Sequence, residues 1–214
     1  MHRIVAFGCS NTYGQGLPDC YVDNGRGPSE AGDTCSKYAY PQVIANRLGY
    51  DCVNLGVPGG SNRIIWHNII NFDFQPDDLV IMYWTYIDRY ASITESRTVN
   101  LGMWSSMDPL CKAWQKYNAV ARSVQDRLLE SLVHIDHANK YIQSKNIKHI
   151  NMKTSRNDLK DTAPDWCTFK WDVKETEDLM VTQPLALDGL HMGSEAHQVI
   201  ADRVIAAMFP NLGV

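Results

Sequence analysis

The 214-residue sequence lacks any apolar run near the ~18 residues that a bilayer-spanning helix needs. It also lacks a strong charge of either sign, and a net charge of −4 gives no general attraction to nucleic acid or anionic membranes. It contains no internal repeat and no low-complexity tract. Because Met1-His2-Arg3 leads directly into a predicted strand, we expect no signal peptide and a cytoplasmic or otherwise intracellular protein.

Six cysteines are present, but none forms a Cys-x-x-Cys pair. Cys20 and Cys35 flank a Gly-rich loop and are the pair that could form a disulfide. Because the chain is not small and shows no secretion signal, reduced thiols are the stronger expectation.

Signals for a cofactor are weak. The glycines between Gly56 and Gly60 precede a predicted helix, but the Lys-Ser/Thr ending of a phosphate loop and the Gly-x-Gly-x-x-Gly spacing are both missing. His134 and His137 could ligate a metal, yet no third ligand is evident and a solvated helix face explains them better. We therefore expect no metal and no organic cofactor.

Short apolar runs alternate with helical patterns along the chain. This alternation predicts an α/β protein with a three-layer α/β/α arrangement, a flavodoxin-like open parallel sheet between two helical layers. Apolar runs bounded by polar residues predict buried strands at 4–8, 52–55, 79–83 and 148–152. Three- to four-residue periodicity predicts helices at 41–48, 61–71, 109–145 and from Ser194 onward.

Two of these helices carry specific expectations. Between 109 and 145 a single apolar stripe predicts one amphipathic helix, with or without a kink, that buries Val120, Val124, Leu128, Leu132, Ile135, Ala138 and Ile142. In the last helix Ser194 is the expected N-cap.

The length of the chain predicts a single domain over residues 1–214. Insertions near 17–35, 85–145 and 157–184 interrupt the strand–helix alternation, and we expect their loops to lie beside the site and to select the substrate. Four tryptophans in or near these segments could stack on sugar rings or fill the core: Trp104, Trp114, Trp166 and Trp171.

Ser10 and the Asp188-x-x-His191 motif together predict nucleophilic chemistry. Ser10 follows the first strand, at the carboxyl edge of the sheet where ligands bind in open α/β folds. A serine hydroxyl needs a base to remove its proton, and His191 could serve while Asp188 holds the imidazole in the correct tautomer. Either motif alone is weak, because Ser10 could simply make a turn and the Asp-x-x-His could cap a helix.

The motifs resemble those of the SGNH (or GDSL) hydrolase family. Phe7-Gly8-Cys9-Ser10-Asn11-Thr12-Tyr13-Gly14 is similar to the first block, with Cys9 in place of the usual Asp. Asn54-Leu55-Gly56-Val57-Pro58-Gly59-Gly60-Ser61-Asn62 resembles the second block, and Asp188-Gly189-Leu190-His191 the last. The helix predicted within 40–49 is similar to the one that the family places between its first two blocks. The resemblance does not cover the middle insertion.

The resemblance implies an oxyanion hole formed by the backbone N–H groups of Ser10 and Gly59. The family's third block, Gly-x-Asn-Asp, supplies an Asn side chain as a further donor. This chain instead reads Tyr83-Trp84-Thr85-Tyr86-Ile87-Asp88-Arg89. Thr85, or Asn62 from the second block, is therefore the expected substitute.

These residues predict a serine ester hydrolase that acts through an acyl-enzyme. By resemblance its substrate is a small-molecule ester, with an acetyl group on a sugar as one candidate. An inactive scaffold that binds a partner remains the alternative, because the third-block Asn is missing. A lipid-active hydrolase would need a broad apolar mouth, and the polar segments 19–33 and 156–161 argue against it. The oligomeric state stays open.

Overall fold

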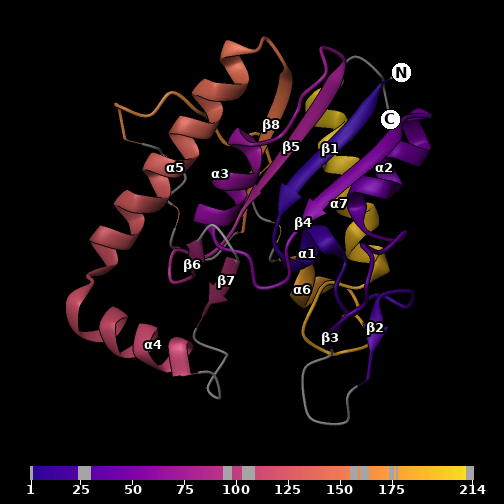
Figure 1. The fold of residues 1–214 in the computed structure, drawn as a ribbon. Helices are drawn as coiled ribbons and strands as arrows, with labels where there is room; N and C mark the ends of the chain where they lie inside the picture. Colours follow the sequence, from indigo (N-terminus) through magenta and orange to yellow (C-terminus); the bar gives the residue numbers. More distant parts are fainter. Residues whose placement is uncertain are drawn as a thin grey trace.

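The computed structural model describes residues 2–23, 30–93, 98–102, 109–154, 159, 164–173, 176 and 178–210. Its centre is a four-stranded parallel sheet with the strand order β4-β1-β5-β8 (Figure 1). The four predicted strands are confirmed, and each is one or two residues longer than expected: β1 Arg3–Gly8, β4 Asp51–Gly56, β5 Asp78–Trp84 and β8 Lys148–Lys153. Parallel pairing brings the carboxyl ends of all four strands to one edge.

Helices cover both faces of the sheet, as the α/β/α prediction requires. One face packs against α2 (Tyr40–Leu48) and α7 (Ser194–Met208), the other against α3 (Asn62–Ile70) and α5 (Val124–Ser144) (Figure 1). Successive side chains of each central strand point to opposite faces of the sheet, and both faces are covered by an apolar core. For this reason β5 is apolar along its whole length beyond Asp78.

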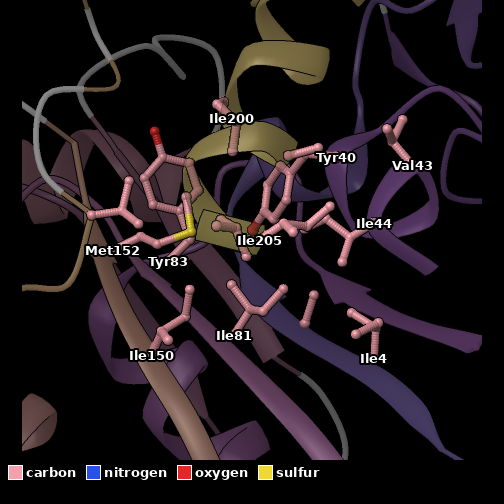
Figure 2. Close-up of a cluster of buried hydrophobic side chains, with 14 of the residues drawn as sticks. Ile4, Tyr40, Val43, Ile44, Ile81, Tyr83, Ile150, Met152, Ile200 and Ile205 are labelled. Carbon is pink, nitrogen blue, oxygen red and sulfur yellow. The ribbon is translucent and has the colours of Figure 1, made fainter. Parts of the chain in front are cut away.

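Two tyrosines mark the core between the sheet and α7. Tyr40 and Tyr83 are completely buried, and their rings meet edge to face with centroids 6.1 Å apart. Figure 2 shows both rings beside aliphatic side chains from the sheet and from α7, including Ile81 and Ile205. A buried phenol needs a hydrogen-bond partner, and the Tyr40 hydroxyl has one in the side chain of Thr12, two residues after Ser10.

The predicted helix over 109–145 is wrong in one respect, because two helices occupy this stretch. α4 (Pro109–Ala121) ends before Arg122, and α5 begins after Ser123, whose side chain accepts from the Asp126 N–H in a capping box. The predicted apolar stripe is correct for α5 from Leu132 onward. Val120 and Val124 are instead 82% and 60% exposed, because the break turns them away from the sheet.

The start of α7 also differs from the prediction. Ser194 is the first helical residue, and Gly193 occupies the N-cap position without a side-chain hydrogen bond. A Cβ at Gly193 would lie within 3.0 Å of the Leu185 carbonyl oxygen, so close packing of the backbone accounts for a glycine here.

Short elements fill the predicted insertions. Two antiparallel hairpins and two single-turn helices occur there or near the sheet edge: β2 Tyr21–Val22, β3 Glu30–Ala31, β6 Tyr90–Ile93, β7 Thr98–Leu101, α1 Ser10–Tyr13 and α6 Leu179–Thr182. The β6–β7 hairpin packs against α3 and α4. No helix in the described part of the chain is long and apolar enough to cross a membrane.

Candidate active site

Ser10 opens α1 directly after β1, at the carboxyl edge of the sheet. It is 4% exposed, and the turn before it is tight because a Cβ at Gly8 would overlap the Thr12 side chain. Cys9 provides the N-cap backbone, and its carbonyl accepts the N–H groups of Thr12 and Tyr13. The Ser10 N–H has no backbone acceptor among the described residues, as expected for the first residue of a helix.

Asp188 and His191 form a closely bonded pair on the loop between α6 and α7. His191 Nδ1 lies 2.6 Å from Asp188 Oδ2. Asp188 Oδ1 accepts the backbone N–H groups of Leu190 at 2.9 Å and of His191 at 3.0 Å. The carboxylate therefore fixes both the imidazole and the loop that carries it. This contact leaves Nε2 of His191 as the ring nitrogen that could exchange a proton with a substrate or a nucleophile.

The Asp188 carboxyl stays ionised although its side chain is only 1% exposed. Burial by itself raises the pKa, but hydrogen bonds from the Leu190 N–H and from the His191 ring and N–H outweigh it, so the pKa lies below its usual value. The ionised carboxylate is therefore placed to accept a hydrogen bond from Nδ1 of His191 and so to set the tautomer of the ring.

Contacts with Gly16 bring the Asp188 loop against the segment that follows Ser10. The Leu187 N–H donates to the Gly16 carbonyl at 3.0 Å. A Cβ at Gly16 would lie 2.6 Å from Asp188 Oδ2, and Gly16 has a φ of +83° that favours glycine. The segment after Ser10 and the Asp188–His191 loop, far apart in sequence, thus meet at the sheet edge. The described residues show no hydrogen bond between Ser10 and His191.

His197 links these two segments through the core, and the sequence analysis missed it. Thr12 Oγ1 lies 3.0 Å from the Tyr40 hydroxyl, and the Tyr40 backbone N–H donates to His197 Nδ1 at 3.1 Å. The His197 imidazole also hydrogen-bonds with the backbone of Met192. No local pattern marks His197, because its partners lie on α2 and on the loop before α7.

A tight turn carries Gly59, the predicted oxyanion donor. The Gly60 N–H donates to the Val57 carbonyl at 2.8 Å, and the Val57 N–H donates to the Gly8 carbonyl at 2.9 Å, which attaches the turn to β1. Pro58 and Gly59 are the central residues, and Gly59 has a φ of +67°, an arrangement typical of a type II turn. The Gly59 N–H has no backbone acceptor among the described residues.

Thr85 and Asn62, the two expected substitutes for the third-block Asn, bind each other. The Thr85 N–H donates to Asn62 Oδ1 at 2.8 Å, and Asn62 Nδ2 donates to the Thr85 carbonyl at 3.0 Å and to Ser131 Oγ at 3.2 Å. The side-chain amide of Asn62 therefore has no hydrogen left to donate to a substrate. The Thr85 hydroxyl is completely buried and has no hydrogen-bond partner in the described structure.

Other predicted features lie away from this arrangement. Trp66 Nε1 lies 2.7 Å from His137 Nδ1, and no group of three or more possible metal ligands occurs among the described residues. All six cysteines, Cys20 and Cys35 included, are free. Trp114 and Trp171 are buried, Trp166 is exposed, and Trp104 lies outside the described residues, as does most of 156–161.

Three solved structures share this architecture over nearly the whole chain. The first is a protein described as a lipolytic member of the G-D-S-L family from Desulfitobacterium hafniense DCB-2, with a TM-score of 0.54, 11% identity, and coverage of 96% of this chain and 98% of that one. The chain has an SGNH hydrolase-like fold. The acetyl xylan esterase AlAXEase gives a TM-score of 0.52 at 10% identity over 97% and 100% of the two chains.

A catalytic mutant of Axe2, an acetylxylan esterase from Geobacillus stearothermophilus, gives a TM-score of 0.50 at 14% identity over 97% of this chain and 94% of that chain. No model of a protein family and no curated protein matches the sequence. Within the SGNH-like fold, the β6–β7 hairpin and α4 belong to the middle insertion that the sequence resemblance does not cover.

Proposed function

We propose that the protein is a serine ester hydrolase in which Ser10 is the nucleophile, His191 the general base and Asp188 the residue that orients His191. The observation that carries this proposal is the 2.6 Å contact between His191 Nδ1 and the ionised, buried Asp188 carboxylate, on a loop that contacts the segment after Ser10. This contact orients the imidazole through Nδ1 and leaves Nε2 available for the serine proton.

The proposed reaction proceeds through an acyl-enzyme. Ser10 Oγ attacks the ester carbonyl while its proton passes to His191 Nε2, and the carbonyl oxygen becomes an oxyanion. That oxyanion accepts hydrogen bonds from the backbone N–H groups of Ser10 and Gly59, and the Thr85 hydroxyl is the proposed third donor. The C–O bond then breaks, and His191 returns the proton to the leaving alcohol. Water, deprotonated by His191, hydrolyses the acyl-enzyme and frees Ser10.

The hydrogen bonds of Thr85 and Asn62 favour Thr85 over Asn62 as this third donor. Both hydrogens of the Asn62 amide are already donated, whereas the Thr85 hydroxyl is unpartnered within the described structure. The Thr85 hydroxyl is also completely buried, so the substrate must open a path to it.

We propose a short acyl ester as the substrate, with acetylated carbohydrate as the class to test first. Two of the structures with this fold are acetylxylan esterases, and a short acyl group suits a nucleophile that is 4% exposed. Hydrolysis rates for acetyl, butyryl and octanoyl esters of one reporter alcohol measure this preference. Faster turnover of the octanoyl ester would instead support a lipid-active hydrolase.

Labelling with a small fluorophosphonate, followed by mass spectrometry of peptides, tests the nucleophile without a known substrate. We expect an adduct on Ser10 in the wild type and none in Ser10→Ala. His191→Ala should slow the labelling by at least about 10³-fold, because the unassisted hydroxyl is a poor nucleophile. Equal ester hydrolysis by wild type and Ser10→Ala would refute the assignment.

A non-catalytic binding protein on the same fold is the second candidate. Two observations favour it: Ser10 and His191 share no hydrogen bond in the described residues, and the third-block Asn is absent. This candidate predicts a folded protein that neither reacts with the fluorophosphonate nor hydrolyses the acetyl ester. An adduct on Ser10 that depends on His191 would exclude it.

A further inference from the structure

We propose that Asn100, from the middle insertion, is a positioning residue that holds the Gly59 peptide in its oxyanion-binding orientation. The inference rests on the proposed function, because it concerns the N–H group that Gly59 would offer to the substrate. Asn100 Nδ2 donates to the Pro58 carbonyl at 3.2 Å. That carbonyl and the Gly59 N–H belong to the same peptide unit.

Planarity of the peptide makes this bond an indirect control of the Gly59 N–H. The C=O and N–H groups of one trans peptide point in opposite directions, so fixing the Pro58 carbonyl also fixes the Gly59 N–H. In a turn of this kind the central peptide can flip by about 180°, which interconverts type I and type II geometry. A flip would point the Gly59 N–H away from the site and bring the carbonyl oxygen toward it.

The hydrogen bond to Pro58 also strengthens the N–H as a donor. A carbonyl that accepts a hydrogen bond polarises its own peptide, and chains of hydrogen bonds reinforce one another in a low dielectric. The bond opposes the flip as well, because a flipped peptide would leave the Asn100 amide without this acceptor.

A second donor from the insertion holds the other side of the turn. Arg89 Nη1 donates to the Gly60 carbonyl at 3.3 Å, and its guanidinium lies 4.7 Å from the centre of the Tyr86 ring. Asn100 and Arg89 therefore bind the carbonyls on either side of Gly59. Both come from the segment after β5, where the chain departs from the third block of the family.

The hairpin that carries Asn100 is itself anchored. Asn100 lies on β7 opposite Ala91 of β6. The Tyr90 ring on β6 stacks on Trp114 of α4 with centroids 4.5 Å apart, and the Arg63 guanidinium of α3 lies 4.8 Å from the centre of the Tyr90 ring on β6. These contacts connect the hairpin to α3 and α4, so Asn100 is presented from a supported element.

The experiment compares Asn100→Ala and Asn100→Asp with Asn71→Ala as a matched control. Asn71 Nδ2 also donates to a backbone carbonyl, that of His67 at 2.8 Å, but it caps the end of α3. The Asp variant retains the shape of the side chain and places an oxygen against the Pro58 carbonyl. Each protein is assayed for kcat and KM with p-nitrophenyl acetate and for its labelling rate with the fluorophosphonate.

We expect both Asn100 variants to lose about 10- to 100-fold in kcat and in labelling rate, with little change in KM, because a misplaced donor acts mainly on the transition state. Asn71→Ala should retain wild-type values. A wild-type kcat in both Asn100 variants would overturn the inference while leaving the proposed function intact.

If the wild type is inactive, an NMR measurement distinguishes failure of the proposed function from failure of the positioning by Asn100. The assigned amide resonance of Gly59 should shift in Asn100→Ala and stay in place in Asn71→Ala, whether or not the protein turns over esters. Inactivity of the wild type would refute the catalytic role of Gly59, and with it the proposed function. An unmoved Gly59 resonance would refute the positioning by Asn100.

Discussion

The backbone N–H of Tyr40 donates a hydrogen bond to Nδ1 of His197 over 3.1 Å, which joins α2 to α7 inside the core. To accept this bond, Nδ1 must be unprotonated. The His197 side chain is also buried, with only 1% of the residue exposed. Burial, together with the charge of His191, lowers the pKa of His197 to about 4. The fold therefore requires a neutral His197.

This relationship predicts that stability falls as the pH drops from ~6.5 toward 4, because the unfolded chain binds a proton at His197 in this range and the folded chain does not. The loss due to His197 reaches on the order of 3 kcal/mol. Urea unfolding at pH 7.5 and pH 5 tests this, because about 2 kcal/mol of the loss is expected by pH 5.

His197→Asn retains an acceptor near Nδ1 and removes the titrating group, so it should reduce this pH dependence. Burial of His134 also lowers its pKa and accounts for part of the slope that remains. An identical slope in the variant and the wild type would contradict the prediction.

Gly16→Ala should reduce ester hydrolysis, and Gly49→Ala is its control. Both glycines have a positive φ, +83° and +68°, so alanine strains each backbone by about 1–2 kcal/mol. The new Cβ at Gly16 would lie 2.6 Å from Asp188 Oδ2, whereas the one at Gly49 meets nothing within 4 Å. We expect both variants to lose stability through backbone strain, Gly16→Ala more so because of the contact with Asp188, and only Gly16→Ala to show at least a ~10-fold lower kcat. Equal activity in the two variants would show that Asp188 tolerates the displacement.

Thr85→Val distinguishes a structural from a catalytic role of the Thr85 hydroxyl. Because the buried hydroxyl has no partner in the described structure, its replacement by a methyl group should leave the free energy of unfolding unchanged or raise it. If Thr85 donates to the oxyanion, kcat with p-nitrophenyl acetate should fall by about 10²–10³. A stable variant with wild-type kcat would remove Thr85 from the proposed oxyanion hole.

Arg3→Met should destabilise the protein without affecting the site. Arg3 Nε and Nη2 each lie 2.7 Å from an Asp78 carboxylate oxygen, across the β1–β5 pair at the amino edge of the sheet. The Asp78 side chain is 1% exposed, so removal of Arg3 leaves a buried carboxylate without its counter-ion, at a cost of about 3–5 kcal/mol. Labelling of Ser10 below the melting temperature should be unchanged, and a large loss of labelling would indicate coupling between the two sheet edges.

The strands were predictable from the sequence because each is a compact apolar run that the sheet buries on both faces. The break between α4 and α5 was harder to predict from the sequence, because Val120 and Val124 continue the apolar periodicity although they are exposed. The local signal for the break was the Ser123–Asp126 capping box inside the expected helix. Ser194 was assigned the N-cap by residue type, but the close backbone approach at Gly193 sets the actual boundary.

By itself the sequence determined the α/β/α class, the strand positions and the candidate residues Ser10, Asp188 and His191, because periodicity and short motifs are local properties. Only the tertiary structure placed Gly16 against Asp188, His197 between Tyr40 and Met192, and Asn100 on the Pro58 carbonyl. Except for the contact between His197 and Met192, each of these contacts joins segments distant in sequence. Their partners become neighbours only when parallel strand pairing brings the loops to one edge of the sheet.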